Sequence, residues 1–253
     1  MPLKITQFLF ALGFFTLPTK RSFHFAMAWR SSGNTNAELV ANLRKSRIFT
    51  DDRIEKAMLA VDRGDFTGHL PYQDSPQGIG WNATISAPHM HAAALEGLKD
   101  HLKPGARVLD VGSGSGYLTA CFARMVAPNG KVIGIEHIDQ LADVSKVNIQ
   151  KHHSDMFTSG LLEIIVGDGR LGHAIPGGYT AIHVGAAAET VPQPLIDQMA
   201  PGGRMLIPVG PQHGNQVFLQ IDKSSNGQEI TKKVIEHVIY VPLTSKSHQI
   251  GGS

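Results

Sequence analysis

The sequence predicts an α/β fold built on a doubly wound, mostly parallel sheet of about seven strands, with a helical segment before it. Short apolar runs alternate with stretches at helical spacing through the middle of the chain. The run at 107–111 ends in a turn with glycines at every second position, 112–116, after which helical spacing resumes. The last two apolar runs have no convincing helix between them, so they form a hairpin and one strand must run antiparallel.

The elements before the sheet are expected to be helices. Amphipathic spacing predicts helices at 36–45 and 51–61, the second capped by Thr50 or Asp51. Residues 74–91 lack apolar periodicity and contain two prolines and two glycines, so they should form a loop that leads into a helix at 88–102.

The sheet is predicted from apolar runs that each end in a turn signal. Because the chain has 253 residues and is 42% hydrophobic, residues 27–253 can form a single enzyme-sized domain with a sizeable core. The expected strands are 107–111, 131–136, 162–166, 179–184, 203–209, 216–222 and 234–241.

Residues 1–26 are not expected to belong to this fold. The apolar stretch 5–17 is too short to span a bilayer comfortably. Three interpretations stay open: a secretion signal, a membrane or organelle anchor, and an upstream extension of a cytosolic enzyme with Met27 as an internal start. The cytosolic interpretation is preferred, because Lys20 and Arg21 stand where a cleavage site would have small residues.

Composition argues against several partners. A net charge of +2 without a basic stripe does not indicate nucleic acid binding, and no stable membrane association is expected. Cys121 is the only cysteine and lies in an apolar helix pattern, so it is expected in the core, with no disulfide framework. His89 and His91 have a spacing seen in some metal sites, but without further ligands no metal is expected. Nothing in the sequence suggests more than a monomer.

The acid before the glycine turn indicates the ligand. Asp110 lies two residues before Gly112, where it would repel a pyrophosphate and attract a ligand that carries a sulfonium and an ammonium group. The turn also lacks the third glycine of the dinucleotide fingerprint. Both points favour S-adenosylmethionine over NAD. The glycines should let the backbone approach this ligand, with the amides at the start of the helix facing the cleft.

Two further acids are predicted at the same edge of the sheet. Glu136 ends the strand 131–136 and is placed to accept both hydroxyls of a ribose. Asp168 follows the strand 162–166, where it could accept a hydrogen bond from an adenine amino group. The alternative interpretation is that each is a solvated acid at a strand end.

Hydroxyl groups precede the helix expected at 88–102. Thr84 and Ser86 lie just before its N-terminus, where free amides and the helix dipole favour a carboxylate. From chemistry alone, a role of Ser86 as a mere helix cap is equally well supported.

Five sequence blocks together resemble the protein-L-isoaspartate (D-aspartate) O-methyltransferase family, over about residues 27–249. The glycine turn is shared by most class I methyltransferases, whereas Ala-Thr-Ile-Ser-Ala-Pro-His-Met is specific to this family. The blocks are 82–90, 109–116, 167–170, 181–188, and 201–204 with 208–210.

The resemblance implies a Rossmann-like fold and methyl transfer from S-adenosyl-L-methionine, leaving S-adenosyl-L-homocysteine. The implied substrates are damaged proteins and peptides with L-isoaspartyl or D-aspartyl residues, whose free α-carboxylate is methylated before a succinimide forms. It also implies that Ser86 is the catalytic serine. The implied cofactor contacts are Ala83, Thr84, Ile85, Ser86, His91, Asp110, Gly112, Glu136, Asp168, Gly169, Thr244 and Gln249.

Two other classes of function are weighed against this one. An NAD-dependent oxidoreductase would need a third fingerprint glycine and would have to tolerate Asp110. A non-catalytic adaptor that keeps the fold would bind the cofactor without turnover. An assay with an isoaspartyl peptide and labelled cofactor separates the three.

Overall fold

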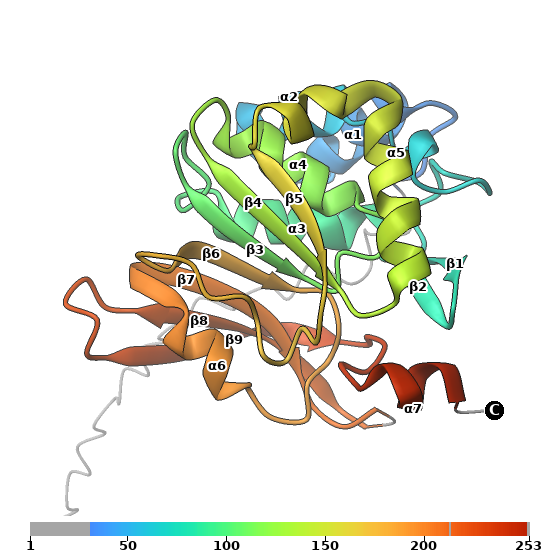
Figure 1. Ribbon diagram of the computed structural model, residues 1–253. Coiled ribbons are helices and arrows are strands. Elements are labelled where there is room, and N and C mark those ends of the chain that lie inside the picture. Colours follow the sequence, from blue (N-terminus) through green and yellow to red (C-terminus); the bar gives the residue numbers. More distant parts are fainter. Residues whose placement is uncertain (1–30, 213, 252–253) are drawn as a thin grey trace, which may run out of the picture.

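The computed structural model describes residues 31–212 and 214–251, so the expectation for residues 1–26 lies outside the described residues. Helices and strands alternate as the sequence predicts, around one central sheet (Figure 1). The helices are α1 (Asn36–Lys45), α2 (Asp52–Ala60), the 3-10 turn η2 (Arg63–Asp65), α3 (Pro88–Leu98), α4 (Tyr117–Val126), α5 (Asp139–Thr158), α6 (Gln193–Asp197) and α7 (Lys246–Gly251). The strands are β1 (Gln77–Gly80), β2 (Ala83–Ile85), β3 (Arg107–Val111), β4 (Lys131–Glu136), β5 (Leu162–Val166), β6 (Tyr179–Val184), β7 (Met199–Val209), β8 (Gln216–Lys223) and β9 (Ile230–Val238).

The main sheet has seven strands in the order β5-β4-β3-β6-β7-β8-β9. Strands β3 to β7 are parallel, and β8 runs antiparallel to both of its neighbours, which confirms the predicted fold class and the antiparallel strand. After β5 the chain returns to the far side of β3 and adds β6 there. The order therefore reverses between β3 and β6, and such a switch point is where α/β sheets bind ligands.

The two faces of the sheet are covered unequally. Val108 and Val132 point into a core shared with α1 to α5, whereas Leu109 and Ile133 pack on the opposite face. In Figure 1, α1 to α5 lie on one side of the sheet and α6 on the other. No helix of the described residues is both long and apolar enough to span a bilayer.

Two local predictions are confirmed in the helices. Asp51 caps α2, since its side chain accepts a hydrogen bond from the Arg53 amide at 2.8 Å. Cys121 is fully buried in α4. The start of α4 depends on Gly116, whose φ is +88° and where a Cβ would lie 2.5 Å from Ser145 Oγ.

Other boundaries differ from the predictions. Residues 74–91 contain the hairpin β1-β2, which has no apolar alternation because neither strand belongs to the main sheet. Helix α3 ends at Leu98 instead of residue 102, and β7 begins at Met199 instead of residue 203. Strand β9 covers Ile230–Val238 instead of 234–241, because pairing with β8 sets its register and its first residues are mostly polar. The short polar helix α7 was not predicted.

Candidate active site

A cleft with two adjoining compartments lies where the order of the strands reverses. We name them after one residue each. Together with their openings to solvent, the Glu136 compartment measures about 540 Å³ and the Ser86 compartment about 350 Å³. Both compartments are lined by Thr84, Gly112, Gly114 and Gly185. Their shared boundary is therefore formed by the hairpin β1-β2, the glycine turn and the end of β6.

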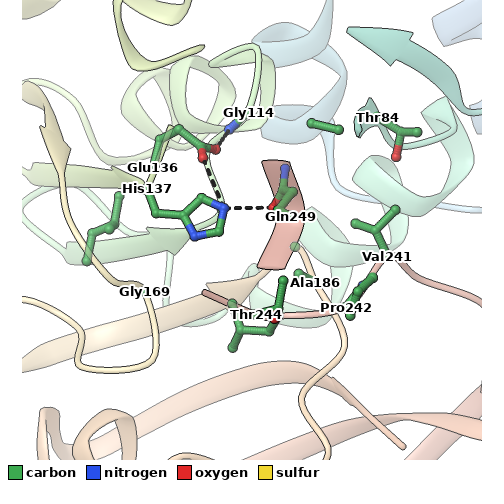
Figure 2. A pocket seen from close by; sticks show the side chains of 15 residues that line it. Thr84, Gly114, Glu136, His137, Gly169, Ala186, Val241, Pro242, Thr244 and Gln249 are labelled. Carbon is green, nitrogen blue, oxygen red and sulfur yellow. Dashed lines mark hydrogen bonds and ion pairs between the residues drawn. The ribbon is translucent and has the colours of Figure 1, made fainter. Parts of the chain in front are cut away.

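Glu136 lies at the end of β4 and is held by two backbone amides, of which Figure 2 shows that of Gly114. Its Oε2 accepts from Gly114 N at 3.1 Å, and its Oε1 accepts from Ile138 N at 3.0 Å. The residue is only 6% exposed. Because a carboxylate oxygen has two lone pairs, each oxygen can accept a further hydrogen bond from a ligand hydroxyl.

Helix α7 closes one side of the Glu136 compartment (Figure 2). The Gln249 carbonyl Oε1 accepts from His137 Nε2 at 2.7 Å, and its amide Nε2 donates to Trp81 O at 2.9 Å. Asn82 Nδ2 in turn donates to the Gln249 backbone carbonyl at 2.9 Å. Gln249 therefore connects the end of β4 with the tip of the hairpin β1-β2. Thr244 lines the same compartment.

The glycine turn provides space but not free amides. Gly112 has a φ of +75°, and nothing lies within 4 Å of the place where its Cβ would be. The amides of Gly112 and Ser113 both donate to Ile135 O at 2.9 Å, and that of Gly114 donates to Glu136. These three amides are therefore not available to a ligand, because neighbouring β4 supplies their acceptors, and the prediction about the amides at the start of α4 concerns other groups.

One buried hydroxyl in this turn is left for a ligand. Ser113 lines the Ser86 compartment and is 7% exposed. Within the described chain its Oγ has no hydrogen-bond partner. A buried polar atom without a partner is costly, so this hydroxyl fits a site that receives a polar ligand.

Asp110 is buried and held by two side chains. Its Oδ2 accepts from Thr119 Oγ1 at 2.6 Å, and its Oδ1 lies 2.8 Å from His183 Nδ1. Asp110 is 2% exposed and lines the Ser86 compartment together with His183. Sequence reasoning assigned no role to Thr119 or His183. His183 could have been singled out because it is a polar residue in the apolar run that forms the end of β6. In the sheet it lies in register with Asp110 on the neighbouring strand β3.

Asp168 lies at the same sheet edge but lines neither compartment. Its carboxylate binds the nearby Arg170, with Nη2 at 2.6 Å and Nε at 2.9 Å, and these hydrogen bonds lower the pKa of Asp168. Gly169 does line the Glu136 compartment. A Cβ there would lie 2.5 Å from Val111 Cγ1, so glycine is required by this close approach.

Ser86 is not a helix cap. Ala87 is the N-cap of α3, and the first-turn amide of His89 donates to Asp74 Oδ1 at 2.9 Å, so the interpretation of Ser86 as the cap is wrong. Ser86 is half-buried in the wall of its compartment. Its backbone carbonyl accepts from Arg63 Nη2 at 2.8 Å.

The same arginine determines the state of His91. Arg63 Nη1 lies 3.2 Å from His91 Nδ1. Because a guanidinium only donates, Nδ1 is the acceptor and Nε2 carries the proton. Burial, and then the charge of Arg63, lower the pKa of His91 well below its usual value, so the ring is neutral. Nothing in the sequence pattern pointed to Arg63.

The two histidines considered for metal binding have different partners. His89 Nδ1 lies 2.8 Å from Asp74 Oδ1, whereas His91 faces Arg63. No group of three or more His, Cys, Asp or Glu side chains among residues 31–212 and 214–251 is arranged to hold a metal ion.

The structure brings all the predicted contact residues except Asp168 into the lining of the two compartments. The Glu136 compartment contains Ala83, Thr84, Gly112, Glu136, Gly169, Thr244 and Gln249, and the Ser86 compartment contains Thr84, Ile85, Ser86, His91, Asp110 and Gly112.

Known proteins resemble this chain over almost all of the described fold. A relative from Caenorhabditis elegans, a protein-L-isoaspartate O-methyltransferase, is 60% identical over 223 residues, which cover 88% of this chain and 98% of the relative. Protein-L-isoaspartate O-methyltransferase 1 of Arabidopsis thaliana is 52% identical over 88% of this chain and 96% of its own length.

A solved structure supports the same relationship. A beta-aspartate methyltransferase of Plasmodium falciparum in complex with S-adenosyl-L-homocysteine superposes with a TM-score of 0.77 at 37% identity, covering 84% of this chain and 99% of that one. The family model of protein-L-isoaspartate(D-aspartate) O-methyltransferases matches residues 34–248. The chain therefore belongs to the protein-L-isoaspartate(D-aspartate) O-methyltransferase family.

Proposed function

We propose that this protein transfers a methyl group from S-adenosyl-L-methionine to the free α-carboxylate of L-isoaspartyl and D-aspartyl residues in damaged proteins and peptides. Family membership supports this reaction. The observation that carries it is the cleft itself. A compartment walled by the buried carboxylate Glu136 adjoins one that holds Ser86, His91 and the buried carboxylate Asp110.

The residues of the cleft fit the methyl donor. Glu136 is placed to accept the ribose hydroxyls, and Gly112 leaves open space beside it. The carboxylate of Asp110 favours a sulfonium nearby. When bound, the donor supplies a methyl group activated by positively charged sulfur. Thr244 and Gln249 are proposed to hold it from the side of α7.

The acceptor needs little chemical activation. With the donor bound, a carboxylate oxygen of the substrate would take the methyl group, and the electron pair of the carbon–sulfur bond would stay on sulfur. The carboxylate is already ionised at neutral pH, so no strong base is required. Proximity and alignment can contribute roughly 7–11 kcal/mol. Ser86 Oγ and His91 Nε2–H are proposed donors that orient the acceptor carboxylate. The methyl ester then closes to a succinimide without the enzyme, which completes the repair step.

A variant of Ser86 tests this proposal. Peptides that differ only in isoaspartate or aspartate are incubated with labelled donor and wild-type protein, Ser86→Ala or the distant helix-end variant Ser159→Ala. Only the isoaspartyl peptide should be labelled. Ser86→Ala should lower kcat/KM by about ten- to a hundredfold while leaving S-adenosyl-L-homocysteine affinity within about twofold. Equal labelling of both peptides overturns the repair reaction, and binding without turnover in the wild type indicates an adaptor.

We also propose that the protein works in the cytosol as a monomer. Asn82-Ala83-Thr84 is a glycosylation sequon at the rim of the cleft, where a glycan would replace one hydrogen of Asn82 Nδ2, the atom that donates to Gln249 O. That arrangement suits a compartment without glycosylation. Fractionation of cells that express the tagged chain tests the location, and light scattering after size exclusion tests the oligomeric state.

A further inference from the structure

Arg63 is a fully buried cation behind the wall of the Ser86 compartment. It is 0% exposed and lies in the turn η2. Its guanidinium donates to Ser86 O at 2.8 Å and to His91 Nδ1, and its Cζ lies 5.4 Å from the ring centroid of Tyr117. Ser86, His91 and Tyr117 all line the compartment. A single side chain thus supports three wall residues from behind.

The positive charge of Arg63 has no ion-pair partner. Among the described residues, no Asp or Glu oxygen forms a salt bridge with it, and its Nε has no hydrogen-bond partner. The nearby groups of Tyr117 and Asp74 raise its pKa, but Asp74 makes no ion pair with Arg63: its Oδ1 is bound to the amide and ring of His89, and its Oδ2 has no hydrogen-bond partner among the described residues. Burial lowers the pKa of Arg63 to about 10, so it stays protonated at neutral pH. A buried charge without a counter-ion is costly and therefore requires a reason.

The reason suggested by the geometry is the charge of the substrate. The compartment contains a fixed carboxylate, Asp110, on β3. The proposed reaction brings a sulfonium and an acceptor carboxylate into the same small space. Asp110 favours the sulfonium but would repel the acceptor, so a fixed positive charge is needed to admit a second carboxylate.

We propose that Arg63 is the positioning and specificity-determining cation for the acceptor. Its charge makes the Ser86 compartment select a carboxylate over the neutral side-chain amides and esters of peptides. Its hydrogen bonds fix Ser86 and direct the Nε2–H of His91 into the compartment. This inference rests on the proposed methyltransferase reaction and adds how that reaction selects its acceptor.

Chemical rescue tests the role of the charge. Arg63→Ala leaves a cavity that guanidinium can enter, and urea has a similar planar shape but no charge. Three quantities are measured for each protein: the KM for the isoaspartyl peptide, kcat, and the affinity for S-adenosyl-L-homocysteine. Each is measured without additive, with guanidinium and with urea, at concentrations that leave the melting temperature unchanged. The matched control is Arg107→Ala, because Arg107 also donates to two backbone carbonyls, of Gly177 and Gly178, far from the cleft.

We expect Arg63→Ala to raise the peptide KM at least about tenfold while cofactor-product affinity stays within about twofold. Guanidinium should restore the KM and urea should not, and Arg107→Ala should resemble the wild type. An unchanged KM, an equal rescue by urea, or no rescue by either overturns the inference.

A second pair of variants tests the same inference if Arg63→Ala does not fold. Arg63→Lys keeps the charge and Arg63→Gln keeps a neutral donor, so the lysine variant should have the lower peptide KM. Equal values in the two variants overturn the inference. If wild-type protein itself does not methylate the isoaspartyl peptide, the proposed function fails instead.

Discussion

At the scale of single residues, the charged groups of the cleft are buried and held by neighbours. Asp110 binds Thr119 and His183, and Glu136 accepts two backbone amides. Arg63 donates to Ser86 O. Groups held in this way need little rearrangement when charge develops, which is the condition for electrostatic stabilisation of a transition state.

Glu136 offers a direct test of cofactor binding. Glu136→Ala removes the proposed acceptor of the ribose hydroxyls and leaves the amides of Gly114 and Ile138 without their partner. We expect a loss of about 1.5–3 kcal/mol in S-adenosyl-L-homocysteine binding by calorimetry. Glu136→Gln keeps one acceptor oxygen and should lose less. Glu163→Ala, on an exposed part of β5, is the control, and an unchanged affinity in Glu136→Ala would show that this compartment does not bind the nucleoside.

His91 predicts how stability depends on pH. Burial holds its pKa in the folded state well below the unfolded value of about 6.5. Below that pH the unfolded chain takes up a proton that the folded chain does not, so the free energy of unfolding should fall with decreasing pH, by up to about 1.4 kcal/mol per unit for one histidine. Above it this contribution is fully present.

Denaturant unfolding between about pH 5.5 and 7.5 measures that slope. The variant His91→Gln should have a shallower dependence. His101 and His153, whose pKa values burial also lowers, remain in both proteins, so the comparison isolates His91. Parallel curves would show that the pKa of His91 is the same in the folded and the unfolded chain.

At the scale of elements, α7 and the hairpin β1-β2 depend on each other. The tip of the hairpin has three consecutive residues in the left-handed region, with φ of +89° at Gly80, +49° at Trp81 and +55° at Asn82. The two non-glycine residues carry backbone strain. Their hydrogen bonds to Gln249 offset it, and Lys246 adds an ion pair with Asp139 at 2.9 Å.

We expect this connection to slow the release of the bound cofactor product. Gln249→Ala removes the side-chain bonds to His137 and Trp81. S-adenosyl-L-homocysteine should then dissociate about tenfold faster in stopped-flow measurements, since two hydrogen bonds contribute about 1–2 kcal/mol. His248→Ala changes an exposed side chain on the same helix and should have the wild-type rate. A Gln249→Ala protein with an unaltered dissociation rate would mean that α7 does not retain the ligand.

At the scale of the whole molecule, the strand order creates the cleft. The reversal between β3 and β6 places the ends of β3, β4 and β6 around one opening. Helix α7 and the hairpin lie at the same end of the sheet (Figure 1). All described elements that form the cleft lie between residues 63 and 251. We therefore propose that residues 1–26 are not needed for the fold or the chemistry.

A shortened chain tests this proposal. A protein of residues 27–253 should have the melting temperature and kcat/KM of the full chain within error, because the family model begins at residue 34. Thermal unfolding and the peptide assay measure both quantities. A large loss in either would show that the first 26 residues contribute to the domain.

The sequence alone determined the elements whose pattern is local. Strands β3, β4, β5 and β6 were predicted to the residue, because buried parallel strands are short apolar runs with clear turn signals. The carboxyl ends of parallel strands lie at the same edge of a sheet, and this rule predicted that Asp110 and Glu136 share one edge. The hairpin β1-β2 and helix α7 were not predicted, because neither contains apolar residues at a regular spacing.

Only the tertiary structure decided how the site is held. His183 contacts Asp110, which is 73 residues away in the sequence, and Gln249 contacts His137, which is 112 residues away. Arg63 reaches Ser86 and His91 from a turn that no pattern marked. Such contacts depend on the order of strands and the path of loops, which local spacing does not encode. The sequence can thus propose which residues take part in the chemistry, while their hydrogen bonds, burial and protonation states are set by the fold.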